Sequence, residues 1–237
     1  MEDPRPAVVA PKLIVFDVYD TILDMSDIAR RVNALLDSKR GYTIWFELCM
    51  QYTFVDNCTV QFHDFQSIAA ATLKMTAQLL KSSITDDEIK GVLELMKHLP
   101  VKENVQEGLS GIADQDFRIA ALTNSPASLV MHRMEQSGLI SYFEEVLTAE
   151  GVHKYKPSIE VYRWAAHKLN VECTDIMMVS GHGWDIAGAK NAGFQTAYIR
   201  QSNQLLYPLA PTPDLTCRDM IDLCDQLKNI KHSQLVS

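Results

Sequence analysis

The stretch KLIVFDVYDTILD, from Lys12 to Asp24, decides the fold that we predict for this chain. Its four consecutive apolar residues, Leu13 to Phe16, are typical of a strand buried on both faces, as in a parallel sheet. Asp17 follows directly and places a carboxylate at the carboxyl end of this strand. Open α/β sheets bind their ligands at that edge, and we therefore take Asp17 as the centre of the candidate site.

The composition predicts a globular protein of the cytoplasm that binds neither nucleic acid nor a membrane. The chain has 237 residues, 47% of them hydrophobic, which is enough for one full core and a smaller second domain. A net charge of −8 without a basic cluster disfavours contact with nucleic-acid phosphates. No apolar run approaches the roughly 20 residues of a membrane span. Residues 1–11 are expected to be a loose tail and not a signal peptide, and the cysteines show no metal-ligand spacing.

Strands and helices alternate along most of the chain. Expected strands after the first one cover 118–122, 145–147, 176–179 and 195–199, the last of which closes the sheet. Expected helices cover 105–113, 126–138, 158–169, 184–191 and 219–230. This alternation predicts an α/β fold with a Rossmann-like, doubly wound parallel sheet.

Residues 25–102 lack any buried-strand pattern and are predicted to form an inserted, all-helical cap domain. Ser26 is expected to cap its first helix, and the pair Thr85 and Glu88 has the spacing of a capping box. Further helices are expected over Thr43–Tyr52, His63–Leu80 and Asp86–His98. The core domain then consists of residues 1–24 and 103–237.

Polar residues follow four of the predicted strands, and a parallel sheet brings them to one edge. They are Asp17 with Thr21, Thr123 with Asn124, Lys156, and the segment from Ser180 to Asp185. One aspartate after a strand often only caps a helix. Four polar loops in this order, with a lysine between two acidic ones, instead predict an active site.

With these loops, the chain from about Lys12 to Ile230 resembles the haloacid dehalogenase superfamily and, within it, the L-2-haloacid dehalogenase (type II) branch. The first motif is similar to Asp17-Val18-Tyr19-Asp20-Thr21, and the second to Thr123-Asn124. The lysine motif is similar to Lys156-Pro157, followed at the dehalogenase spacing by Tyr162. The last motif is similar to Ser180-Gly181-His182-Gly183-Trp184-Asp185, whose Trp-Asp pair is specific to the branch.

The resemblance implies hydrolysis of a small 2-haloacid in two steps. Asp17 would displace the halide and form an ester, which water then hydrolyses to the 2-hydroxy acid. Lys156 would hold Asp17 ionised, because a neighbouring cation lowers the pKa of a carboxylate, and Asp185 would orient Lys156. Thr21 and Thr123 would supply hydroxyl donors.

The resemblance also implies which residues hold the substrate and the attacking water. The substrate carboxylate would bind backbone N–H groups of Val18 and Tyr19, together with Thr123 and Asn124. His182 would activate the water or serve as a loop donor to a Thr or Ser. Ser180 would belong to the residues that bind the substrate. Trp184 and Phe65 would line an apolar halide pocket or simply pack.

A magnesium-dependent phosphatase is the rival interpretation within the superfamily. Such enzymes have the pattern Asp-x-Asp at the first motif, and this chain has Tyr19 in place of the second aspartate. They also carry an acidic residue at the position of Gly181. A departing halide needs no proton, so Tyr19 suits dehalogenation better than phosphoester cleavage. Two carboxylates beside a lysine also make a poor site for a hard cation. We therefore predict neither a metal nor another cofactor.

One position departs from the dehalogenase pattern. The branch has a halide-accepting arginine shortly before Tyr52-Thr53, and this chain has Phe46 there, with Lys39 or Arg40 as alternative cations. The alternative is therefore a related hydrolase of other or weak activity, or a non-catalytic binding protein. The predicted partner is a small 2-haloacid or a similar small acid, and a homodimer is compatible with this interpretation.

Overall fold

The computed structural model describes residues 8–202 and 204–236, so most of the predicted tail lies outside the described residues. Its centre is a parallel sheet in the order β3-β2-β1-β4-β5-β6. The strands are β1 (Leu13–Phe16), β2 (Arg118–Thr123), β3 (Glu145–Thr148), β4 (Ile176–Ser180), β5 (Gln195–Ile199) and β6 (Leu215–Cys217). The predicted doubly wound α/β fold is confirmed.

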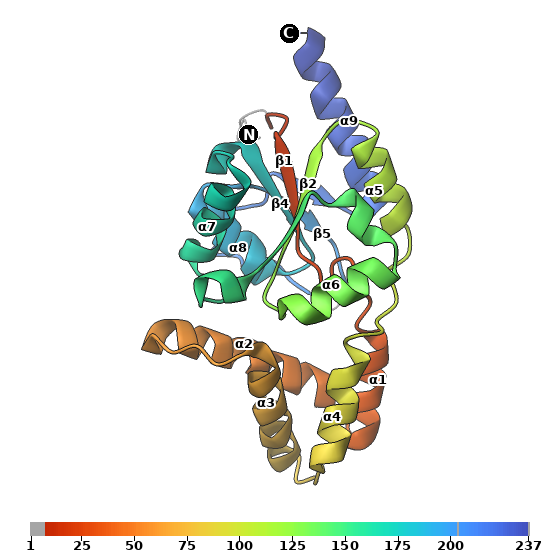
Figure 1. The fold of residues 1–237 in the computed structure, drawn as a ribbon, viewed down its shortest axis with the longest axis vertical. Helices are drawn as coiled ribbons and strands as arrows, with labels where there is room; N and C mark the ends of the chain where they lie inside the picture. Colours follow the sequence, from red (N-terminus) through yellow and green to blue (C-terminus); the bar gives the residue numbers. More distant parts are fainter. Residues whose placement is uncertain (1–7, 203, 237) are drawn as a thin grey trace.

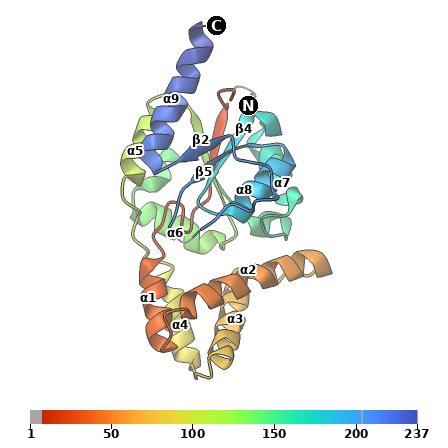
Figure 2. The same ribbon diagram turned by 180° about the vertical axis from the view of Figure 1, so that it is seen from behind.

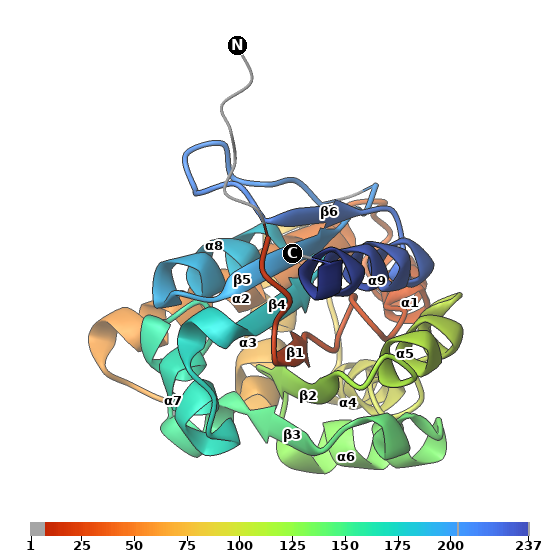
Figure 3. The same ribbon diagram turned by 90° about the horizontal axis from the view of Figure 1, so that it is seen from above.

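Helices cover both faces of the sheet (Figures 1 and 3). Alternate residues of a strand point to opposite faces, and Leu13 and Val15 pack on the side of α7 and α8, whereas Ile14 and Phe16 pack on the side of α5 and α9. The helices of this domain are α5 (Val105–Ala113), α6 (Ala127–Gln136), α7 (Ile159–Leu169), α8 (Gly183–Ala192) and α9 (Met220–Val236). Short 3₁₀ helices cover Leu139–Tyr142, Ala149–Val152 and Cys173–Asp175.

The sheet continues one strand beyond the prediction, which closed it at residues 195–199. β6 pairs in parallel with β5, and its Leu215 and Cys217 are buried while Thr216 between them is exposed. A three-residue strand at the edge of a sheet carries too little alternation to be recognised from the sequence.

The residues between β1 and α5 form four helices below the carboxyl ends of the strands (Figures 1 and 2). They are α1 (Ser26–Leu35), α2 (Gly41–Thr59), α3 (Phe65–Leu79) and α4 (Asp86–Leu95). We call these four helices, with the loops between them, the helical layer. None of the helices in the described part of the chain has the length and apolarity needed to cross a membrane.

The two connections between the helical layer and the sheet run side by side. Leu23 forms an antiparallel bridge with Val101, and the N–H of Asp24 donates to the carbonyl of Pro100 at 2.8 Å. The N–H of Lys102 donates in turn to the carbonyl of Ile22 at 2.9 Å. The helical layer therefore enters and leaves the core through one paired segment, directly after the loop that carries Asp17.

Local capping follows the sequence in one of the two predicted places. The capping box of Thr85 and Glu88 is confirmed at the start of α4. The predicted cap at Ser26 is wrong: Met25 occupies the N-cap position, and both the N–H and the hydroxyl of Ser26 donate to Asp24. Because the hydroxyl of Ser26 donates to the carboxylate of Asp24, it does not cap the helix.

α2 continues past the predicted end at Tyr52 to Thr59, since this stretch contains no glycine or proline and buries Thr53 and Asp56. It ends at Val60, whose backbone is left-handed with φ 58° and ψ 35°. This conformation costs an L-residue about 1–2 kcal/mol, and a β-branched residue rarely adopts it.

We expect Val60→Asn to raise the free energy of unfolding by about 1 kcal/mol, because asparagine tolerates the left-handed region. The side chain of Val60 is 79% exposed, so little apolar contact is lost. Urea denaturation at pH 7 measures the change. Val55→Asn, inside the same helix, serves as the control and should leave stability unchanged or lower it. A destabilised Val60→Asn protein would contradict this account of the end of α2.

Candidate active site

A buried lysine between two carboxylates forms the centre of the site. The Nζ of Lys156 donates to Oδ1 of Asp17 at 2.8 Å, to Oδ2 of Asp185 at 2.8 Å and to the carbonyl of Leu122 at 2.9 Å. All three protons of the ammonium group are thus used. Lys156 and Asp185 are fully buried and Asp17 is 5% exposed. The end of β1, the end of β2 and the first turn of α8 meet at this one ammonium group.

Hydroxyl groups bind the remaining oxygen of each carboxylate. Thr21 Oγ1 donates to Oδ2 of Asp17 at 2.7 Å, and the N–H of Gly181 donates to the same hydroxyl at 2.9 Å. The hydroxyl of Tyr162 donates to Oδ1 of Asp185 at 2.6 Å. Tyr162 follows Lys156-Pro157 in the lysine motif, and its place one turn into α7 brings its hydroxyl to Asp185.

The charges of the three central groups depend on one another. Burial pushes the pKa of Asp17 upward, but the charge of Lys156, with His182 and the hydrogen bonds of Lys156 and Thr21, lowers it overall. Burial likewise works against the charge of Lys156, and the two carboxylates raise its pKa overall. Burial and the nearby Asp17 raise the pKa of Asp185 despite the lysine. The lysine therefore favours an ionised Asp17 at the edge of the sheet.

Free backbone N–H donors lie directly after Asp17 and directly after β2. Among the described residues, no protein acceptor receives the N–H groups of Val18, Tyr19 and Asn124. Unpartnered N–H groups at the ends of strands can bind an anion. Thr123 lies beside them, and its Oγ1 accepts the N–H of Ser125 at 3.2 Å, which leaves its proton for another acceptor.

The side chain of Asn124 has another use. Its Oδ1 accepts the N–H of Lys156 at 2.8 Å, and its Nδ2 donates to the carbonyl of Lys156 at 3.2 Å. Asn124 can therefore offer an incoming ligand its backbone N–H, while its amide group holds the segment that carries the lysine.

His182 lies on the other side of Asp17. Its Nε2 is 3.2 Å from the carbonyl of Tyr19 and 3.8 Å from Oδ2 of Asp17. Its Nδ1 is buried without a partner among the described residues. Its backbone N–H donates to the hydroxyl of Ser180 at 3.1 Å, so Ser180 fixes the loop. With Nε2 as donor to Tyr19, Nδ1 carries the free lone pair that a buried water could use.

Aromatic rings enclose the imidazole of His182. The ring of Phe46, from α2, stacks on it at 5.6 Å between centroids, and the ring of Trp184 stacks on it at 5.1 Å. Tyr42 stacks in turn on Phe46 at 6.0 Å. A cavity of about 260 Å³ lies against Phe46 and Trp184. The helical layer therefore contributes an apolar wall to the site.

Two of the predicted site residues pack their rings into the hydrophobic core. The ring of Tyr19 belongs to the hydrophobic core, and burial raises the pKa of its hydroxyl to about 12. The ring of Phe65, at the start of α3, packs on Tyr155 with 6.4 Å between centroids. Phe65 thus packs against the residue that precedes Lys156.

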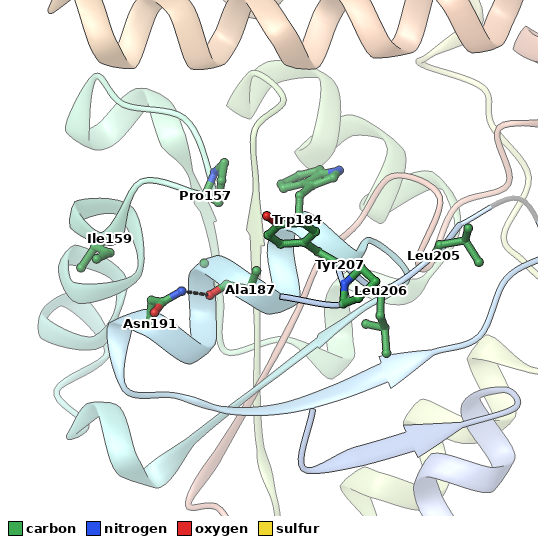
Figure 4. Close-up of a pocket in the computed structure, with 10 residues that line it drawn as sticks. Pro157, Ile159, Trp184, Ala187, Asn191, Leu205, Leu206 and Tyr207 are labelled. Atoms are coloured by element: carbon green, nitrogen blue, oxygen red, sulfur yellow. Dashed lines mark hydrogen bonds between the residues drawn. The ribbon is translucent and has the colours of Figure 1, made fainter. Parts of the chain in front are cut away.

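A larger groove runs along the outside of the site (Figure 4). It has a volume of about 730 Å³, and its lining includes Pro157 and Trp184, the sequence neighbours of Lys156 and Asp185. The loop after β5 supplies the other wall, including Leu205 and Tyr207 (Figure 4).

Comparison with known proteins gives a consistent result. A family model described as haloacid dehalogenase-like hydrolase matches residues 11–193. The (S)-2-haloacid dehalogenase of Pseudomonas sp. (strain YL) is 25% identical over 206 residues, which are 86% of this chain and 88% of that protein. Haloacetate dehalogenase H-2 of Moraxella sp. (strain B) is 23% identical over 205 residues, which are 86% of this chain and 92% of that protein.

The fold is similar to that of solved structures that are named as L-2-haloacid dehalogenases. The L-2-haloacid dehalogenase from Xanthobacter autotrophicus, solved with chloropropionic acid covalently bound, matches with a TM-score of 0.83. The match covers 92% of this chain and 98% of that one at 20% sequence identity.

Replacing the central lysine tests the electrostatics of this site. We expect Lys156→Met to lower the free energy of unfolding at pH 7 by about 3–5 kcal/mol, because it leaves two buried carboxylates without a cation. In the variant both carboxyls have raised pKa values, so the folded chain binds more protons than the unfolded chain near pH 5. The deficit should therefore shrink as the pH falls from 7 to 5.

In the parent protein the pKa of Asp17 is lowered and that of Asp185 is raised, so the two carboxyls change the stability in opposite directions as the pH falls. The lowered pKa of Asp17 contributes stability above its ordinary pKa of 3.8, and this contribution is lost as the pH falls through the folded value. Urea denaturation at both pH values measures the difference. Lys190→Met, at the partly exposed pair with Asp214 (2.6 Å), is the control and should cost at most about 1 kcal/mol. Equal losses in the two variants would refute the assignment.

Proposed function

This chain belongs to the haloacid dehalogenase-like hydrolase family, and we propose that it hydrolyses the carbon–halogen bond of a small 2-haloacid through an ester on Asp17. One observation carries the proposal: Lys156 holds a buried Asp17 in its ionised form, while Tyr19 stands where a phosphatase needs a second acid. The similarity to curated (S)-2-haloacid and haloacetate dehalogenases supports it.

In the first step, the substrate carboxylate binds the free N–H groups of Val18, Tyr19 and Asn124 and the hydroxyl of Thr123. A carboxylate oxygen of Asp17 attacks the halogen-bearing carbon and forms a C–O bond, and the halide leaves with the electron pair of the broken bond. Lys156 keeps Asp17 ionised until the attack. The halide leaves as an anion and needs no proton, so no acid at position 19 is required.

In the second step, water attacks the carbonyl carbon of the Asp17 ester. His182, through the nitrogen that has no protein partner, accepts a proton from the water and returns it to the departing alkoxide of the hydroxy acid. The bond that breaks joins the carbonyl carbon to the original aspartate oxygen. That oxygen leaves with the product, the water oxygen stays on Asp17, and one proton is released to solvent.

The donor set supports a route without a metal ion. Oδ1 of Asp17 and Oδ2 of Asp185 both bind the ammonium of Lys156, and Gly181 offers no side-chain ligand where a phosphatase has an acid. In the described residues, no group of three or more His, Cys, Asp or Glu side chains has a geometry suited to a metal ion. A magnesium ion requires several oxygen ligands in an octahedral arrangement, and these residues do not fit it.

Phe46 favours a second candidate function, a family member that binds a small acid without turning it over. Its apolar ring lies on His182 where the dehalogenase branch has a halide-accepting arginine, and Lys39 and Arg40 are exposed just before α2. The two candidates differ in whether halide is released.

We expect the protein to release halide from chloroacetate, bromoacetate or (S)-2-chloropropionate, and Asp17→Asn to reduce the rate at least about 10³-fold. A halide electrode or a colorimetric halide assay measures the rate. After one turnover in ¹⁸O water, mass spectrometry should find the label in Asp17 and not in the hydroxy acid.

The matched controls concern the metal and the position of the label. Halide release should be unchanged by EDTA. Hydrolysis of a phosphate ester that needs magnesium and is abolished by EDTA would support the phosphatase instead. Label found only in the product of the first turnover would exclude the Asp17 ester, because water would then have attacked the substrate carbon directly.

We expect Phe46→Arg to raise halide release roughly 10- to 150-fold, since a charge-assisted hydrogen bond to the halide is worth about 1.5–3 kcal/mol. The guanidinium can still stack on His182. Phe46→Leu, which loses the ring and gains no charge, is the control and should not be faster than the parent. An inactive parent with an active Phe46→Arg variant would favour the non-catalytic candidate for the natural chain.

A further inference from the structure

Two asparagine side chains hold the backbone of Tyr155 and Lys156 from opposite sides. Oδ1 of Asn57 accepts the N–H of Tyr155 at 2.9 Å, and Nδ2 of Asn57 donates to its carbonyl at 2.8 Å. Asn124 binds the N–H and carbonyl of Lys156 in the same manner. Asn124 belongs to the core, whereas Asn57 comes from the last turns of α2 in the helical layer.

Other contacts of the helical layer involve Tyr155 and its neighbour Lys154. The hydroxyl of Tyr155 donates to the carbonyl of His63 at 2.6 Å, and its ring stacks on Phe62 at 5.1 Å. The Nζ of Lys154 donates to the carbonyl of Asn57 at 3.1 Å. Tyr155 is fully buried. The helical layer thus meets the core at the peptide group next to the central lysine.

The position of the lysine backbone matters because its ammonium has no free proton. Nζ of Lys156 is bound by three acceptors at 2.8–2.9 Å, so a shift of the backbone lengthens at least one of these bonds. A displacement of about 1 Å at a reacting group costs on the order of 100-fold in rate.

We propose that Asn57 is a positioning residue for Lys156: by binding the Tyr155 peptide from α2, it sets the lysine between Asp17 and Asp185, so that the site is complete only while α2 is docked on the core. The effect on the loop is independent of the proposed dehalogenase function, and the effect on turnover rests on it.

A plain docking contact would behave differently from a positioning residue. Loss of such a contact lowers stability and leaves the chemistry of the folded protein unchanged. Loss of positioning weakens the contact between Lys156 and Asp17, and the pKa of Asp17 then rises. The charged or titratable groups that face Asp17 are Lys156 and His182, with Asp185 beyond the lysine. Of these, only Lys156 directly follows the residue whose backbone Asn57 binds.

The test compares Asn57→Ala with two matched variants. Tyr155→Phe removes another hydrogen bond between the same two parts but leaves the peptide contacts of Asn57, and Thr59→Ala removes a hydroxyl bound within α2 at 2.9 Å. Hydrogen exchange by mass spectrometry reports the amides of residues 154–156 and does not depend on activity. The pH profile of kcat/KM for bromoacetate, together with kcat and KM, reports the chemistry.

For Asn57→Ala we expect faster exchange at residues 154–156 and an acid limb moved to higher pH. We also expect kcat to fall between about 10- and 100-fold, with KM changed less than about threefold. Tyr155→Phe and Thr59→Ala should keep the parent acid limb. Unchanged exchange, or a lower melting temperature with the parent acid limb, would overturn the proposal. If the parent releases no halide, the proposed function fails, and the exchange data still decide whether Asn57 fixes the lysine segment.

Discussion

The buried ammonium of Lys156 is the interaction on which the rest of the site depends. It joins Asp17 to Asp185 at 2.8 Å each and also binds the carbonyl of Leu122. A buried carboxylate without a cation takes up a proton or destabilises the fold. The same lysine therefore stabilises the sheet edge and favours the ionised form of Asp17 on which the proposed reaction depends.

Several features of the molecule serve the position of this one group. The hydroxyls of Thr21 and Tyr162 fix the carboxylates, and Asn124 fixes the lysine backbone. The rings of Phe46 and Trp184, from the two parts of the chain, stack on His182 beside Asp17. The site thus combines one fixed negative charge, free backbone donors for an acid and a largely apolar wall, a combination that suits a small acid whose leaving group needs no proton.

The motifs of the site could be predicted because each lies in a short, continuous stretch. Asp17 follows its strand directly, and Ser180 to Asp185 form one loop between β4 and α8. The short strand β6 and the extension of α2 to Thr59 could not be predicted, since an edge strand of three residues and a helix end without glycine or proline leave no clear pattern. The cap at Ser26 was wrong because Asp24 competes for its hydroxyl.

By itself, the sequence determined the parallel α/β fold, the helical layer between β1 and α5, and the residues that meet at the sheet edge, because hydrophobic period and strand ends are local properties of the chain. Only the tertiary structure decided that Phe46 lies on His182, that the ring of Phe65 packs against Tyr155, and that Asn57 binds the peptide next to Lys156. Asn57 and Tyr155 are 98 positions apart, and only the packing of α2 against the core brings such residues together.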